Sequence, residues 1–176
     1  MNSQKIRIAY HESSHAIMAL VCGQKIQCVS LVGNEAYPGF VKLENTRPMD
    51  AISEIRICLA GGVGESLLLD NTIKIAIDDF DRAIRSVEYL LLSNPHFAKR
   101  AQGLIDPGLE AMVDVENPLV RACIADCIDD CVRFMSRLKP LILMIAEELL
   151  SKDELGGDEV SRIYSSFVKQ LQSKSN

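Results

Sequence analysis

Tryptophan is absent from this 176-residue chain, aromatic residues make up only 5% of it, and histidine occurs three times. The sequence contains no run of about 18 apolar residues, which a transmembrane helix would need. Its first fifteen residues are polar and charged where a secretory signal requires an apolar stretch. We therefore expect a cytoplasmic protein without a membrane span.

Basic residues are outnumbered, with 19 Lys and Arg against 24 Asp and Glu, and they are scattered along the chain. A nucleic-acid-binding protein needs a concentrated basic surface, so this class is excluded. Six cysteines are too few for a disulfide scaffold of this length, and we expect reduced thiols. Hydrophobic residues make up 48% of the chain, which is enough for a sizeable core. The length predicts one domain over residues 1–176.

Apolar residues recur at three-, four- and seven-residue spacings over most of the chain, as in amphipathic helices. The first expected helix is capped by Asn2 or Ser3 and ends at Gly23. Further helices are expected over 49–69, over 77–92, and from 118 to about 150 with a break at Pro140.

The last expected helix follows Gly156–Gly157 and is capped by Asp158. Its inward-facing residues are expected to be Val160, Ile163, Phe167 and Leu171.

Two short segments have β character. Residues 26–32 are rich in β-branched side chains, and residues 40–44 alternate so that Val41 and Leu43 share one face. They predict a hairpin, whereas residues 94–117, with two of the six prolines, predict an irregular loop. The predicted fold class is mainly α (α+β): a compact helical domain with a small β hairpin.

The residues with the clearest chemical meaning are His11-Glu12-Ser13-Ser14-His15, which match the pattern H-E-x-x-H. On a helix, residues four apart project from one face, so both imidazoles can bind one metal ion. Glu12 is then placed to act as general base on a water held by that metal. Zinc suits an imidazole-rich site, and we expect one Zn²⁺ per chain near the N-terminus.

A catalytic zinc needs a third protein ligand. The carboxylates that could supply it are Glu65, Asp70, Asp78, Asp79 and Asp81. Asp78 and Asp79 can equally be explained as charges that favour the start of a helix, so spacing alone leaves the choice open.

Other groups have simpler explanations. His96 is expected on the surface, and Cys123, Cys127 and Cys131 are expected to form an apolar stripe because free cysteine behaves as a small hydrophobe. The glycine pair Gly61–Gly62 is costly inside a helix and predicts close approach of another backbone. The segment 61–64 lacks the Lys-Ser/Thr ending of a phosphate-binding loop.

Five segments, taken in order, resemble the peptidase domain of FtsH-type zinc proteases. They are IAYHESSHAIMAL, similar to the A-Y-H-E-A-G-H-A helix; VSLV with PGFVKLE; ICLAGGVGESLLLD, similar to L-x-G-R-A-A-E-x-L-x-F-G; IDDFDRAIRSVEYLL, similar to N-D-L-x-R-A-T; and MIAEELLSKDELGGDEVSRI. This resemblance implies a mainly helical zinc endopeptidase domain, which in that family follows a membrane segment and an AAA+ ATPase and assembles as a hexameric ring.

The resemblance also implies roles for particular residues. It matches His11 and His15 to the zinc-binding histidines, Glu12 to the catalytic glutamate and Asp79 to the third ligand. Glu65 matches a glutamate that we expect to support the ligands without binding the metal. The chain departs from the pattern at Ser13-Ser14, where the family has Ala-Gly, and at residues 62–65, where R-A-A-E has become GVGE. The ATPase and the membrane anchor have no counterpart, so the sequence looks like a stand-alone peptidase domain.

These observations predict a zinc metalloendopeptidase that acts on unfolded polypeptides or peptides. The strand around Gly39, Phe40 and Val41 is either an edge that pairs with an extended substrate or an ordinary hairpin strand. The alternative function is a zinc-binding but inactive module used for association. Expected partners are a polypeptide substrate, other copies of the chain, and an ATPase acting in trans.

Overall fold

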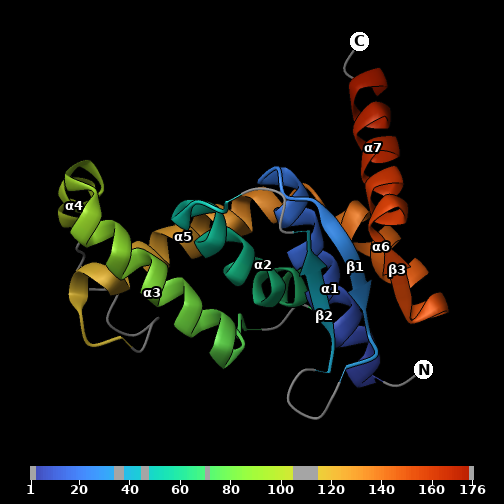
Figure 1. Cartoon of the computed structure of the whole chain (residues 1–176), viewed down its shortest axis with the longest axis horizontal. Helices are drawn as coiled ribbons and strands as arrows, with labels where there is room; N and C mark the ends of the chain where they lie inside the picture. The colour runs from blue at the N-terminus through green and yellow to red at the C-terminus, as the bar shows by residue number, and fades with distance from the viewer. Residues whose placement is uncertain (1–2, 34–37, 45–47, 70–71, 105–114, 175–176) are drawn as a thin grey trace.

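The computed structural model describes residues 3–33, 38–44, 48–69, 72–104 and 115–174, and its helices and strands are arranged as in Figure 1. The first helix, α1 (Ser3–Val21), is followed by β1 (Ile26–Ser30) and β2 (Phe40–Leu43). Gly23 lies between helix and strand with φ of 74°, a backbone conformation that favours glycine. The predicted first helix is confirmed, with its end before Gly23; of its expected caps, Ser3 is the first helical residue and Asn2 lies outside the described residues.

The predicted hairpin is confirmed, because β1 and β2 pair antiparallel. The sequence did not predict β3 (Glu154–Gly156), which pairs antiparallel with β1 on its other side. This strand has three residues between two helices, too few for an alternating pattern to be visible. The sheet order is β2-β1-β3, so β1 is central and β2 is an edge.

The centre of the molecule is α2 (Ala51–Leu69), which packs against α1, α3 (Ile77–Ser93) and α5 (Pro118–Ser136). Most of its residues are buried, including Ile55, Leu59 and Val63. It begins two residues after the predicted start because Asp50 accepts hydrogen bonds at its first turn. The elements that carry the expected site therefore share one core.

The region predicted as an irregular loop contains a helix, α4 (Pro95–Gln102), so this prediction was wrong in part. The Asn94 side chain accepts hydrogen bonds from the backbone of His96 and Phe97. Pro95 occupies the first turn, where its missing N–H is not needed. His96 is exposed on α4, as expected for a surface histidine. The prediction for residues 105–114 lies outside the described residues.

The break expected at Pro140 is confirmed. Helix α5 ends at Ser136, and α6 (Lys139–Lys152) begins with Pro140 in its first turn. On α5, Cys123 and Cys131 are buried and Cys127 is half-buried, as expected for an apolar stripe. Burial raises the pKa of Cys123 to about 11 and that of Cys127 and Cys131 to about 12, so these thiols stay protonated at neutral pH.

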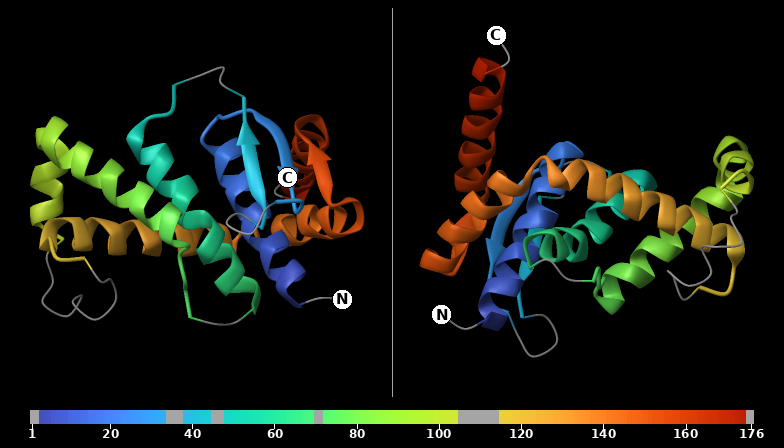
Figure 2. Two further views of the ribbon diagram at one scale, coloured as in Figure 1. Left: turned by 60° about the horizontal axis from the view of Figure 1, so that its bottom comes forward. Right: turned by 180° about the vertical axis from the view of Figure 1, so that it is seen from behind.

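The last helix, α7 (Gly157–Lys174), projects beyond the rest of the molecule in Figure 1. Figure 2 shows the sheet between α1 and α7, and β1 contacts both helices. Asp158 lies within the first turn of α7, so the prediction that it caps the helix was wrong. Val160 and Phe167 are buried as predicted, but Leu171 is exposed because the helix has by then left the body of the protein. Among the described residues, no helix is long and apolar enough to cross a bilayer.

Candidate metal centre

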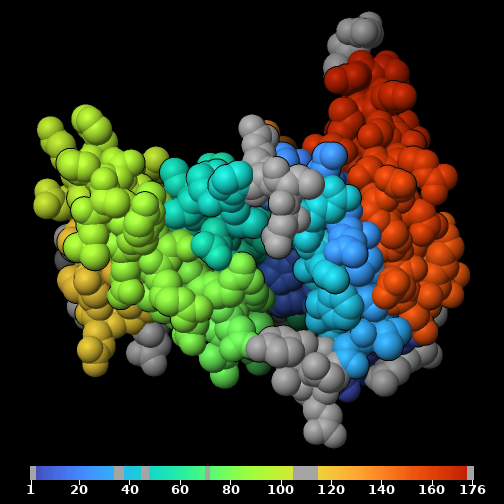
Figure 3. Space-filling view, in the orientation of Figure 1, coloured from blue at the N-terminus to red at the C-terminus, as the bar shows by residue number. Residues whose placement is uncertain are grey.

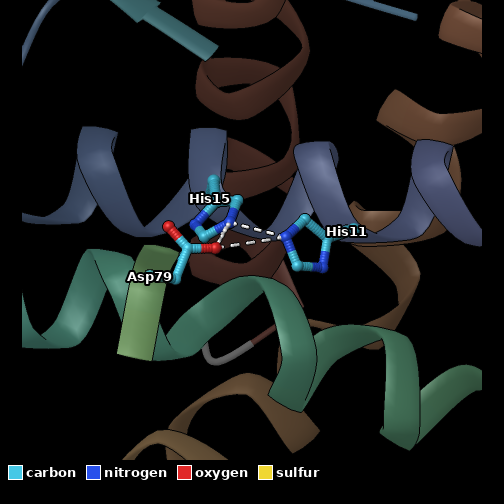
Figure 4. A group of neighbouring side chains, drawn as sticks. All are labelled: His11, His15 and Asp79. Atoms are coloured by element: carbon cyan, nitrogen blue, oxygen red, sulfur yellow. Dashed lines mark hydrogen bonds and ion pairs between the residues drawn. The ribbon is translucent and has the colours of Figure 1, made fainter. Parts of the chain in front are cut away.

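Three side chains from two helices converge beside α2, as Figure 4 shows. The Nε2 atoms of His11 and His15, one turn apart on α1, are 2.9 Å from each other. Asp79 Oδ2, from the first turn of α3, lies 3.4 Å from the His11 nitrogen and 3.2 Å from the His15 nitrogen. In the part of the chain that the structure describes, this is the one group of three His, Cys, Asp or Glu side chains with ligand atoms within 4.8 Å of one another.

The separations between these three atoms suit a small metal ion. Ligand atoms about 2.1 Å from a tetrahedral zinc ion are about 3.4 Å apart, close to the observed distances. His15 Nδ1 is 2.7 Å from the carbonyl oxygen of Ile57. A carbonyl oxygen can only accept, so this nitrogen carries the proton and donates. The lone pair of His15 is therefore on Nε2, the atom that faces His11 and Asp79. Two imidazole nitrogens and one carboxylate form a donor set that fits zinc.

The floor of this site is Gly61 of α2. A Cβ atom at that position would collide with the Nε2 atoms of both His11 and His15. The glycine pair was expected to admit another backbone, and this is confirmed for Gly62, where a Cβ would collide with the Lys74 carbonyl oxygen. At Gly61 the approaching atoms belong to the histidine side chains. The sequence therefore predicted a close contact at this glycine, but not that side chains would make it.

Glu65 approaches the far side of the His11 ring. Its Oε2 atom is 3.8 Å from His11 Nδ1, which is an ion-pair distance longer than a hydrogen bond. Its Oε1 atom accepts from the guanidinium of Arg7, at 2.8 Å from Nε and 2.7 Å from Nη2. Sequence reasoning missed Arg7, although its position one turn before His11 on the same helix face could have drawn attention to it.

The charges within the site favour a protonated His11 when no metal is bound. Burial opposes that charge, but hydrogen bonding to Asp79, the Glu65 carboxylate and the charges nearby outweigh it and raise the pKa of His11 to about 9. Burial raises the pKa of the Asp79 carboxyl. The two histidines outweigh this effect and hold that pKa well below its usual range. Asp79 is thus ionised and ready to bind a cation.

Glu12 lies next to the two histidines and is 8% exposed. Burial raises the pKa of its carboxyl, an effect that the neighbouring histidines partly offset. Gly39, the residue before β2, packs directly on this side chain, because a Cβ there would stand 2.9 Å from Glu12 Cγ and 2.6 Å from Ile8 Cγ2. The β2 strand therefore reaches the side chain that was predicted to act as a base.

These residues line a cleft of about 960 Å³. In Figure 3 the surface is hollowed between β2 and α3, with α1 visible at the bottom. One wall is formed by Gly39 and by β2, including Phe40 and Val41, and the other by the start of α3 and by α2. The free edge of β2 is thus beside the cleft, since its only partner in the sheet of the described residues is β1.

The other candidate ligands lie elsewhere. Asp78 is exposed at the rim of the cleft, one residue from Asp79 but outside the cluster, and Asp81 is also exposed. Asp70 lies outside the described residues. The structure therefore brings together His11, His15 and Asp79, with Glu12 and Glu65 around them.

No protein-family model matches the chain, but several curated proteins are similar to it. An ATP-dependent zinc metalloprotease FtsH of Acholeplasma laidlawii is 25% identical, and the match covers 92% of this chain and 29% of that protein. Two such proteins of Phytoplasma mali, FtsH 1 and FtsH 3, are 24% identical over 89% of this chain. The FtsH of Opitutus terrae is 24% identical over 90% of it. The chain spans less than a third of the length of these relatives, and it is distantly related to the FtsH zinc metalloproteases.

Proposed function

We propose that this protein is a zinc-dependent metalloendopeptidase. The observation that carries this proposal is the cluster of His11, His15 and Asp79 beside the buried Glu12, in a cleft that is bordered by an edge strand. The names of the distant relatives support the same class of activity.

In this proposal His11, His15 and Asp79 hold one zinc ion per chain. Bound zinc supplies Lewis-acid chemistry, which polarises a carbonyl and makes water more acidic. Glu12 acts as general base and takes the proton of the attacking water, and burial suits it to that role by making its carboxylate more basic. Glu65 does not bind the metal, and instead keeps the His11 ring in place through its position opposite Nδ1.

We propose that the substrate is an unfolded polypeptide or a peptide. An extended chain can pair with the free edge of β2 at Gly39, Phe40 and Val41, and this would bring a peptide bond to the side chain of Glu12. A folded protein cannot present an extended strand in this way. We propose that an ATPase acting in trans unfolds larger substrates, because a folded protein must be opened before one of its segments can pair with β2. Assembly with other copies, a single stand-alone domain and a cytoplasmic location remain predictions.

The test of the activity is Glu12→Gln. Glutamine keeps the shape of the side chain but cannot accept the proton, so the variant should bind zinc like the parent and fail to cleave casein. Both proteins are compared at equal zinc content, with the parent plus chelator as a blank. Equal cleavage by parent and variant would refute the role of Glu12. Zinc binding without any cleavage by the parent would favour the alternative, an inactive module used for association.

The test of the ligand set compares Asp79→Ala, Asp78→Ala and Glu65→Gln. Asp78 and Asp79 diverge by about 100° around the helix axis, so only one of them can face the histidines. Asp79→Ala should therefore lose zinc, whereas Asp78→Ala should keep it and Glu65→Gln should weaken it by about 10–100-fold. Zinc retained at parental affinity by Asp79→Ala would show that the third ligand is another residue.

A further inference from the structure

Asp79 lies in the first turn of α3, which the core holds only in part, through the half-buried Phe80. The buried residues of this helix begin at Ala83, whereas Ile77 in the first turn is 79% exposed and Asp78 is exposed as well. Ala76, which precedes the helix, provides no capping side chain. A metal ligand must be kept within a fraction of an ångström of its position, so polar contacts that add to the packing of Phe80 would help to fix this turn.

One carboxylate of α2 reaches across to the next two turns of α3. Glu54 Oε1 accepts from Arg82 Nη2 at 3.2 Å, and Glu54 Oε2 accepts from Ser86 Oγ at 2.8 Å. Asp79, Arg82 and Ser86 are spaced three and four residues apart, so they lie on the same face of α3. Glu54 thus ties that face to α2 directly behind Asp79.

A surface ion pair alone would not explain this arrangement. Exposed pairs contribute at most about 1 kcal/mol to stability, and the side chains of Arg82 and Glu54 are 47% and 35% exposed. Ser86, by contrast, is buried, and its hydroxyl finds its acceptor in Glu54. In addition, Arg82 lines the same cleft as Asp79, so a guanidinium released from Glu54 could turn to the Asp79 carboxylate and compete with a metal.

We propose that Glu54 is a positioning residue for the metal centre: by holding Arg82 and Ser86, it keeps the first turn of α3 where Asp79 meets the two histidines. This inference rests on the proposed zinc site. A contact that only stabilises the fold would change the zinc affinity and the stability of the metal-free protein together. A positioning residue changes mainly the zinc affinity.

The experiment compares Glu54→Gln and Ser86→Ala with the parent in three measurements. Zinc affinity is measured by competition with a chromophoric chelator, thermal unfolding is followed with the metal removed, and the visible spectrum is recorded with Co²⁺ in place of zinc. The matched control is Asp126→Asn, which removes another bond between helices, the 2.9 Å pair of Arg100 and Asp126 that links α4 to α5.

Glu54→Gln should bind zinc about tenfold more weakly and should alter the Co²⁺ spectrum, with Ser86→Ala acting in the same direction. The metal-free Tm of Glu54→Gln should fall no further than that of Asp126→Asn, which should bind zinc like the parent. Parental zinc affinity in Glu54→Gln, or an equal loss in Asp126→Asn, overturns the inference and leaves the zinc site standing. If the parent itself binds no more zinc than His11→Ala/His15→Ala, both the site and the inference are wrong.

Discussion

Ser14 of α1 and Gly64 of α2 occupy complementary space. A Cβ atom at Gly64 would collide with Ser14 Oγ and stand 2.6 Å from Ser14 Cβ. The FtsH pattern that the sequence resembles has glycine at the position of Ser14 and alanine at that of Gly64. The two departures therefore compensate, since one helix has gained a side chain where the other has lost one. The serine does not displace the motif helix, and its hydroxyl donates to the Tyr10 carbonyl oxygen at 2.7 Å.

This contact predicts strong coupling between the two positions. Gly64→Ala alone should destabilise the protein by about 1–3 kcal/mol, because the added methyl group overfills a buried contact. In the double variant Ser14→Gly/Gly64→Ala the collision is removed, and the loss of helix propensity at one position is offset by the gain at the other. The double variant should unfold within about 1 kcal/mol of the parent in urea.

The control for this cycle is Gly103→Ala, since among the described residues a Cβ at Gly103 would meet only the Arg100 carbonyl oxygen, at 3.4 Å. That variant should be nearly neutral. Additive effects of Ser14→Gly and Gly64→Ala would show that the two positions do not share space.

Much of the fold could be predicted because the helices bury regular apolar faces, as Ile55, Leu59 and Val63 do in α2. The features that the sequence did not predict depend on tertiary contacts. The strand β3 exists because Leu155 lies opposite Val29 in the sheet, which is a tertiary contact. Leu171 follows the helical pattern of α7 but lies beyond the body of the protein, so periodicity alone could not reveal its exposure.

The site divides in the same way. His11, Glu12 and His15 belong to one helix, so their spacing was enough to predict a shared face. Asp79 comes from a different helix, and spacing could not choose it over Asp78 or Glu65. The choice depends on how α3 docks on α2.

Gly61→Ala should impair metal binding more than folding. Alanine is favoured over glycine in a helix by about 1 kcal/mol, but at this position its methyl group would meet the Nε2 atoms of both histidines. The rings can give way only by leaving the positions in which they face Asp79. We expect zinc affinity to fall by about 100-fold or more, measured by chelator competition. Zinc binding at parental affinity would mean that Gly61 does not shape the site, and Gly103→Ala again serves as the control.

Ser13→Ala should leave the protein as stable as the parent or stabilise it by about 1 kcal/mol. Ser13 is fully buried, and within the described residues its hydroxyl makes no hydrogen bond. A buried unpaired hydroxyl is costly, and alanine also has the higher helix propensity. The comparison is Ser53→Ala, which removes a buried hydroxyl that donates to Asp50 at 2.6 Å and should be destabilising. A clear loss of stability in Ser13→Ala would imply a partner for this hydroxyl.

Asp50 should make the stability of α2, and with it the floor of the metal site, dependent on pH. Its carboxylate accepts from the Ser53 hydroxyl and from the Ser53 backbone N–H, and these bonds lower its pKa from the ordinary value of 3.8. A lowered pKa means that the folded protein favours the ionised form, so this stabilisation is present above about pH 4 and is lost as the pH falls further. Asp50→Ala should lower the free energy of unfolding by about 1 kcal/mol at pH 7, as expected for loss of a helix cap.

The variant Asp50→Asn keeps a capping oxygen but not the charge. Its deficit in the free energy of unfolding should be constant from about pH 7 to 5 and should shrink below about pH 4. Urea unfolding at each pH measures this, with Asp129→Asn, at an exposed carboxylate of α5, as the control. A deficit that grows toward low pH would mean that the carboxylate is not stabilised in its ionised form.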